Sequence, residues 1–219
     1  MRTDYERNLK ELQDKVLAMG SMVEKAIILS MDSMKNRDFD LANKVVEDDA
    51  QINSKRFEIE EECVHLIATQ APMARDLRVI VAVLNIIIDL ERIGDHAAGN
   101  AKITIMLGDE PPLKPLIDLP RMAEKTADML RRALDAFVRR DADAARAITK
   151  EDDEVDALYD QIFRELLYFM TQDPKTVGRA TRLIWAAHNM ERSADRVTNI
   201  CERAVFVVTG RQEEIAGKY

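Results

Sequence analysis

Acidic side chains recur in both halves of the sequence at a spacing suited to binding a cation. Four pairs, each four residues apart, have this spacing: Asp49/Asn53 and Glu91/Asp95 in the first half, Asp152/Asp156 and Glu191/Asp195 in the second. Residues four apart share one face of a helix, where two carboxylates repel by roughly 0.2–0.5 kcal/mol. Because both halves keep this unfavourable spacing, we predict that the acids bind a hard cation, which carboxylate and amide oxygens suit.

The second half carries the fuller copy of this acidic stripe. Asn199 and Glu202 continue the helix face of Glu191 and Asp195, which gives four oxygen-bearing side chains in a row. Asp152 falls within the apolar spacing of its own helix, where burying a lone carboxylate is costly. A cation shared between the Asp152/Asp156 and Glu191/Asp195 pairs would offset that cost.

The first copy departs from this pattern. Gly99 and Lys102 stand where the second half has Asn199 and Glu202. Lys102 places a positive charge at the end of the stripe. We therefore expect a first-half site to bind more weakly or to hold fewer ions.

Two other interpretations compete with a cation site on the stripes. The acids could lie on a solvated face paired with arginines such as Arg192, Arg196 and Arg203, which would make the chain a metal-free helical scaffold or adaptor. Glu62 and His65 form a Glu-x-x-His motif of the kind that ferritin-like di-iron bundles use, but its counterpart at Glu165 lacks the histidine. This di-iron alternative is the weaker one. The sequence has no phosphate-binding glycine loop and no catalytic nucleophile, so we predict a non-enzyme without catalytic residues.

Helices should position these side chains. Aromatic residues make up only 5% of the chain, with 7 glycines and 6 prolines, which favours helices over sheets. Apolar residues recur at steps of three and four. The pattern predicts an all-α fold with helices over 5–36, 39–70, 75–107, 119–139, 142–172 and 176–209. Asp38 and Asp141 are predicted N-caps.

The halves repeat one another about a proline-rich linker. Motifs of the first half return in the second at a nearly constant offset, and four prolines gather between Pro111 and Pro120. We predict a first bundle over 1–108, a linker over 109–120, a second bundle over 121–210 and a tail over 211–219. Long helices joined by short turns pack antiparallel, so each half should form a three-helix bundle, in a tandem repeat of two.

Composition limits the environment and the partners. The net charge of −8 argues against a nucleic-acid binder. No apolar run is long enough to cross a bilayer, and the first residues do not form a signal peptide. Cys63 and Cys201 lie inside helical patterns, which is typical of reduced cysteines in a cytoplasmic protein.

The order and spacing of these motifs resemble the PhoU family of phosphate-signalling proteins. The resemblance rests on Asp49-x-x-x-Asn53 followed by Glu91-Arg92-x-x-Asp95, and on Asp152-x-x-x-Asp156 followed by Glu191-Arg192-x-x-Asp195. It covers nearly the whole chain up to Gly210. The segments Ala74–Arg78 and Met19–Glu24 also look like that family.

The resemblance implies a function. It implies two PhoU-like bundles with metal on Glu/Asp-x-x-x-Asp sites, as iron, zinc, Mg or Mn. It implies a cytosolic regulator, usually a homodimer, that works with the ATPase of the phosphate ABC transporter and with a sensor histidine kinase. Such a protein would be peripheral to the membrane at most. It would repress the phosphate-starvation genes when phosphate is plentiful.

Overall fold

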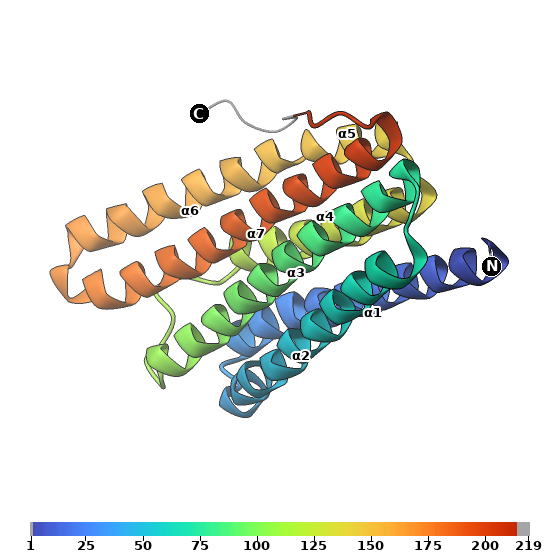
Figure 1. Ribbon diagram of the computed structural model, residues 1–219. Helices are drawn as coiled ribbons and strands as arrows, with labels where there is room; N and C mark the ends of the chain where they lie inside the picture. Colours follow the sequence, from blue (N-terminus) through green and yellow to red (C-terminus); the bar gives the residue numbers. More distant parts are fainter. Residues whose placement is uncertain (1, 214–219) are drawn as a thin grey trace.

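The computed structural model describes residues 2–213, which form helices and connecting segments without a strand (Figure 1). Of the predicted tail, 214–219 lie outside the described residues. The helices are α1 (Arg2–Asn36), α2 (Phe39–Gln70), α3 (Ala74–Leu107), α4 (Asp118–Arg139), α5 (Ala142–Thr149), α6 (Asp152–Gln172) and α7 (Val177–Thr209), with a 3-10 turn at Pro174–Thr176 before α7. None of the described helices is long and apolar enough to cross a bilayer. The predicted all-α fold is confirmed.

The turn that leads into the middle helix is built alike in both halves. Arg37 and Arg140 adopt left-handed backbone conformations with φ of 56° and 55°. The next residues, Asp38 and Asp141, each accept a hydrogen bond from a backbone N–H three residues on, at 2.9 Å. Such a bond satisfies one of the free donors at a helix start. Both predicted N-caps are confirmed.

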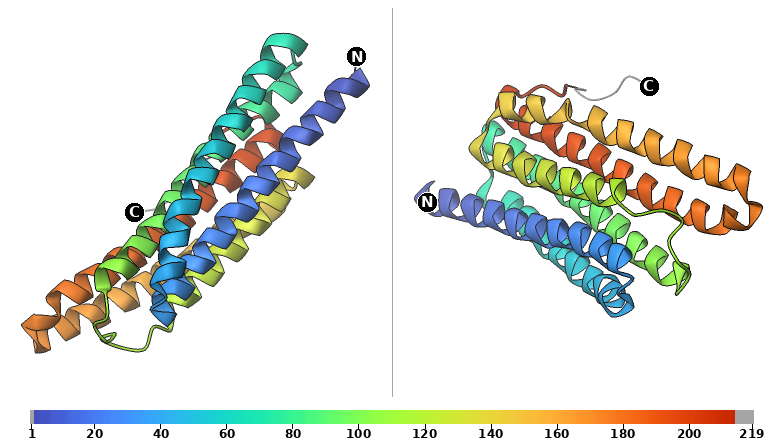
Figure 2. Two further views of the ribbon diagram at one scale, coloured as in Figure 1. Left: turned by 90° about the horizontal axis from the view of Figure 1, so that it is seen from below. Right: turned by 180° about the vertical axis from the view of Figure 1, so that it is seen from behind.

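Two helical layers lie side by side. The first contains α1, α2 and α3, the second contains α4, α5 with α6, and α7 (Figures 1 and 2). Helices α3 and α7 pack against each other at the centre, and α1 packs on α4. One apolar core extends through both layers, from Leu12 and Val16 in α1 to Val197 and Ala204 in α7.

The middle helix of the second half is broken, so the prediction of one helix over 142–172 is wrong. Helix α5 ends at Thr149, a turn occupies Lys150 and Glu151, and α6 begins at Asp152. Glu151, Asp152, Asp153 and Glu154 are four consecutive acids. Acidic side chains are favourable in the first turn of a helix, next to its positive dipole end, which promotes a new start at this point.

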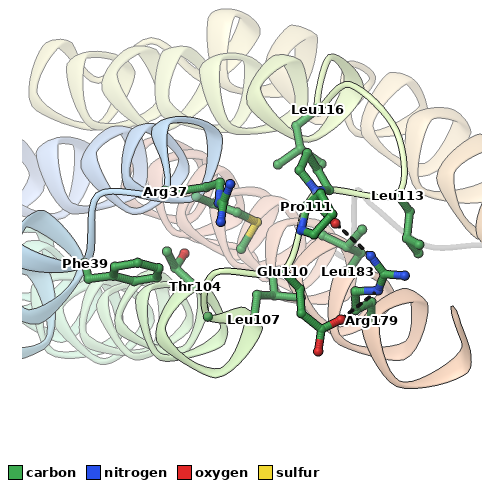
Figure 3. Close-up of a pocket in the computed structure, with 13 residues that line it drawn as sticks. Arg37, Phe39, Thr104, Leu107, Glu110, Pro111, Leu113, Leu116, Arg179 and Leu183 are labelled. Carbon is green, nitrogen blue, oxygen red and sulfur yellow. Dashed lines mark hydrogen bonds and ion pairs between the residues drawn. The ribbon is translucent and has the colours of Figure 1, made fainter. Parts of the chain in front are cut away.

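Arginines from both layers hold the start of the linker. Arg37 donates to the carbonyl oxygen of Asp109, and Arg179 Nη1 donates to that of Pro111 at 2.8 Å. Arg179 Nε also lies 3.0 Å from Glu110 Oε2 (Figure 3). The mainly apolar pocket between these groups has a volume of about 30 Å³, and its arginines already have partners. This pocket is much smaller than the roughly 300–1,000 Å³ of typical ligand pockets.

Candidate metal centre

Helices α6 and α7 bring the second acidic pairs together. Asp152 and Asp156 occupy the first turns of α6, and Glu191 and Asp195 lie on the facing part of α7. Asp152 Oδ1 and Glu191 Oε2 are buried and accept no hydrogen bond. A buried oxygen without a donor costs about 1–3 kcal/mol, more when charged, so each such atom requires an explanation.

The acids of the second half have raised pKa values. Burial raises the pKa of Asp152 to about 7, and the charges of Asp156, Asp195 and Glu191 add to the effect. Burial is also the main cause of raised pKa values at Asp156, Glu191 and Asp195. The cluster therefore holds negative charge that its surroundings neutralise only in part, which is what a cation site requires.

Some of this charge has partners within the protein. Arg192 Nη1 lies 3.3 Å from Asp195 Oδ2, and His188 Nδ1 lies 3.1 Å from Glu191 Oε2. The His188 contact is an ion pair only when the imidazole is protonated. The positive end of the α6 dipole favours an ionised Asp152, by typically 0.3–1 kcal/mol. The raised pKa of Asp152 shows that burial and repulsion outweigh these effects.

The two remaining residues of the predicted stripe make other contacts. Asn199 Nδ2 donates to Asp89 Oδ1 of α3 at 3.4 Å, so this amide faces the other layer. Glu202 lies near the buried thiol of Cys201. Burial raises the pKa of that thiol to about 12, and the negative charge of Glu202 raises it by a smaller amount. The structure thus gathers Asp152, Asp156, Glu191 and Asp195 most clearly, and the roles of Asn199 and Glu202 stay predictions.

The first half forms a looser version of the cluster. Asp49 Oδ1 is buried without a hydrogen bond, while its Oδ2 accepts from Asn53 Nδ2 at 3.2 Å. Burial and the charge of Asp95 raise the pKa of Asp49, and Lys102 lowers it. A pocket of about 100 Å³ opens beside Asp49.

An arginine neutralises the other first-half pair. Arg92 lies 3.4 Å from Glu91 Oε2 and 3.1 Å from Asp95 Oδ2. Arg192 contacts Asp195 in the same way, but its counterpart acid Glu191 faces His188 instead. Pairing with an arginine therefore accounts for Glu91 and Asp95 better than for the second-half acids, although the two pairs are about equally exposed.

As the side chains stand, no three of the described His, Cys, Asp or Glu residues converge closely enough to hold a metal ion. The chemistry of the donors nevertheless suits a cation in each half, because Asp49 in the first half and Asp152 and Glu191 in the second each have a buried carboxylate oxygen that accepts no hydrogen bond. The di-iron alternative finds no such support. Glu62 is ion-paired with Lys15, and His65 is exposed.

Sequence reasoning missed a polar contact between the layers. Asp89, only 7% exposed, accepts from Arg196 Nη1 at 3.2 Å as well as from Asn199. His96 Nδ1, about two turns after Asp89 on α3, lies 3.1 Å from Ser193 Oγ. The signal was available, because Asp89 interrupts the apolar run Ile86-Ile87-Ile88 and Leu90.

The comparisons with known proteins agree with this repeated architecture. The PhoU domain model matches twice, over residues 16–104 and 119–204. The chain belongs to the PhoU family. It is 38% identical over 215 residues to a phosphate-specific transport system accessory protein PhoU homolog of Clostridium acetobutylicum, covering 98% of each chain. It is 35% identical to the PhoU protein of Escherichia coli K12, covering 94% of this chain and 85% of that protein.

Solved PhoU structures share the fold. The crystal structure of PhoU from Pseudomonas aeruginosa superposes with a TM-score of 0.89 at 36% identity, covering 94% of this chain and 100% of that one. The phosphate transport system regulatory protein PhoU from Streptococcus pneumoniae gives a TM-score of 0.90 at 28% identity, covering 96% and 99%. The resemblance that the motifs indicated is confirmed, and so is the PhoU-like helical fold.

Proposed function

We propose that this chain regulates phosphate uptake and phosphate-starvation signalling, acting with a phosphate ABC transporter and its sensor histidine kinase. The proposal is supported by relatives named as accessory or regulatory proteins of phosphate transport that cover almost the whole chain. It is a non-enzymatic role, exercised in the cytoplasm as a homodimer.

Cation binding is the chemical part of the proposal. The observation that carries it is a pair of buried oxygens that accept no hydrogen bond, Asp152 Oδ1 and Glu191 Oε2, of which the second has only the His188 imidazole beside it. With Asp156 and Asp195 they offer hard oxygen ligands for iron, zinc, Mg or Mn. A bound cation would supply positive charge on the surface of a protein whose net charge is −8. Such a patch could face acidic partners or an anionic membrane.

Terbium luminescence tests this site directly. Tb³⁺ prefers carboxylate oxygens and emits when a nearby indole transfers energy to it. Trp185 is the only tryptophan and lies on α7, two turns before Glu191. We expect sensitised emission with wild type and its loss with Glu191→Gln/Asp195→Asn. The matched control is Asp153→Asn, an exposed acid of the same α6 turn. Emission that survives the double substitution would reject the site.

The regulatory part needs a cellular test. In a bacterium that lacks its own PhoU protein, expression of this chain should restore repression of a phosphate-starvation reporter at high phosphate. We expect Glu191→Gln/Asp195→Asn to weaken that repression and Asp153→Asn to leave it intact. Failure of the wild-type chain to repress, despite normal expression, would count against the regulatory role.

A metal-free scaffold is the second candidate, because Arg92 already neutralises Glu91 and Asp95 in the first half. This alternative predicts that the Glu191→Gln/Asp195→Asn variant represses as well as wild type. It also predicts equal or slightly higher stability, because a repulsion has been removed. Metal analysis of untagged protein by mass spectrometry would separate the two candidates independently of the reporter.

A further inference from the structure

An arginine of α4 forms hydrogen bonds with the residue that separates α5 from α6. Arg132 Nη1 and Nη2 donate to Glu151 Oε1 and Oε2, both at 2.7 Å, which is a two-pronged contact. Asp128 Oδ2 accepts from Arg132 Nε at 2.7 Å, and Lys125 Nζ lies 2.6 Å from Glu151 Oε2. Paired N–H···O bonds of this kind fix direction as well as distance.

Glu151 is the residue at which the chain changes helix. Its backbone N–H donates to the carbonyl oxygen of Ile148 at 3.0 Å, and its own carbonyl oxygen accepts from the N–H of Glu154 at 3.1 Å. The same residue thus closes the end of α5 and opens α6. Asp152, whose Oδ1 is buried and unpaired, follows immediately. A side chain that holds Glu151 therefore fixes where the first turn of α6 begins.

Among the described residues, the first half has no such contact. At the offset that relates Asp49 to Asp152, Asp48 corresponds to Glu151 and Leu29 to Arg132. Helix α2 runs without a break through this region, and Leu29 packs on a small apolar cluster with Val45. The Arg132–Glu151 pair is therefore a feature of the second half, where the acidic cluster is also tighter.

We propose that Arg132 and Glu151 are positioning residues for the second-half cation site. Their two-pronged contact holds the α5–α6 break so that Asp152 faces Glu191 and Asp195. The inference rests on the cation binding proposed above and names the residues that set its geometry. Neither residue needs to touch the ion.

Simple electrostatics makes an opposite prediction, which allows a sharp test. If only charge mattered, removing the positive Arg132 would strengthen cation binding, and removing the negative Glu151 would weaken it. If the pair positions Asp152, removing either residue weakens binding. Residues behind the ligands of a metal site typically change its affinity by about 10–100-fold when substituted.

The experiment measures Tb³⁺ affinity by emission sensitised through Trp185 in full-length wild type, Arg132→Met and Glu151→Gln. We expect both variants to bind about tenfold more weakly. The exchanged pair Arg132→Glu/Glu151→Arg should recover part of the loss. Arg131→Met is the matched control, because Arg131 is the adjacent residue of α4 and pairs with Asp128 instead. It should bind as wild type does.

Hydrogen exchange of amides 150–156 in the ion-free proteins gives a readout that does not depend on the ion. We expect faster exchange in Arg132→Met and Glu151→Gln but not in Arg131→Met. Circular dichroism checks folding, and if Arg132→Met fails to fold, Arg132→Lys keeps the charge but loses the two-pronged contact. It should then weaken binding as well.

The outcomes separate the two proposals. Tighter binding by Arg132→Met, or unchanged affinity in both variants, overturns the positioning role and leaves cation binding intact. Absence of binding by wild type overturns cation binding, and the positioning role with it. Loss of affinity in both variants, with Arg131→Met unchanged, supports the positioning role.

Discussion

The two halves of this protein place the same carboxylate motif on equivalent helices, yet they surround it with different charges. Residues 91–100 of α3 and 191–200 of α7 share almost the same sequence of buried and partly buried positions. In the first half, Arg92 lies within ion-pair distance of both Glu91 and Asp95, and Lys102 acts on Asp49. In the second half, burial and the neighbouring carboxylates raise the pKa of Asp152.

The difference shows that a repeated motif does not imply repeated chemistry. A helix pair fixes which side chains face one another, but the net charge at the site depends on neighbours that the motif does not include. Lys102 places a positively charged side chain of the protein where the second half has Glu202. We therefore expect the second half to be the stronger cation site, and the predictions below test this asymmetry.

The largest effect should come from removing the carboxylates of one half at a time. Glu191→Gln/Asp195→Asn should reduce the affinity for Mn²⁺, measured by calorimetry, by roughly 100-fold or more, since direct ligands matter at least as much as the residues behind them. Glu91→Gln/Asp95→Asn removes the equivalent pair and serves as the control, with a much smaller expected loss. Equal losses would show that the halves are alike.

Reversing one charge should make the first half resemble the second. Lys102→Glu removes the internal cation near Asp49 and restores the acid found at Glu202. Near a protein surface a charge change at close range is worth about 1–2 kcal/mol, so first-half affinity for Mn²⁺ should rise by roughly tenfold. Lys44→Glu, an exposed charge on α2, is the control for long-range attraction. A similar rise in both variants would contradict a local role for Lys102.

The sequence predicted the helices, their caps and the acidic pairs because each depends on local spacing. Periodicity defines helices, and Asp38 and Asp141 cap them through bonds three residues away. The break at Glu151 was also encoded, in four consecutive acids, but the apolar spacing of Ile148 and Val155 continues through it and obscured the new start.

Other features of the site depend on contacts between distant segments. The Arg132–Glu151 pair joins α4 to the start of α6, and Asp89 meets Arg196 across the two layers. No spacing along one helix reveals which arginine approaches which acid. Asn199 illustrates the limit, because its position on the stripe was evident but its hydrogen bond to Asp89 required the packing of α3 on α7.

The pKa of Asp152 makes a smaller effect measurable without a cation. Its folded-state pKa of about 7 lies above the ordinary 3.8, so its contribution to stability is fully present below pH 3.8 and is lost progressively as pH rises from there through 7. With a chelator present, the free energy of unfolding should fall between pH 5 and 7, by on the order of 1 kcal/mol after allowance for solvent screening, and level off above that range. Asp152→Asn should remove most of this fall in urea titrations.

Two nearby groups do not obscure that result. Glu151 has a pKa of about 2, so its contribution is present above 4.5 and is lost only as pH falls through 2, far below the measured range. Burial lowers the pKa of His96 to about 4. This lowered pKa makes the free energy of unfolding rise with pH near pH 6, opposite to the effect of Asp152. Because His96 is present in both proteins, its effect cancels in the difference. An identical slope in wild type and Asp152→Asn would contradict the prediction.

The smallest expected effect concerns the space beside Asp49. Gly94 stands where the second half has Ala194, and a Cβ at Gly94 would lie 3.2 Å from Ile52 Cδ1 and 3.4 Å from Asp49 Oδ1. Alanine gains up to about 1 kcal/mol over glycine inside a helix. Ile52 borders the pocket of about 100 Å³ and has room to shift by the small amount required. Gly94→Ala should therefore stabilise the protein by less than 1 kcal/mol, a fraction of the helix gain.

Gly178→Ala in the first turn of α7 is an uncrowded reference for the helix gain, because nothing lies within 4 Å of a Cβ there. In urea titrations, Gly94→Ala should raise the free energy of unfolding by less than Gly178→Ala does. This shortfall in stabilisation reports the crowding at Ile52 and Asp49. A shortfall with unchanged first-half Mn²⁺ affinity would mean that only Ile52 moves. A shortfall together with weaker binding would mean that the missing methyl group leaves Asp49 free to turn. That second result would mean that Gly94 favours binding in the first half and partly offsets the effect of Lys102.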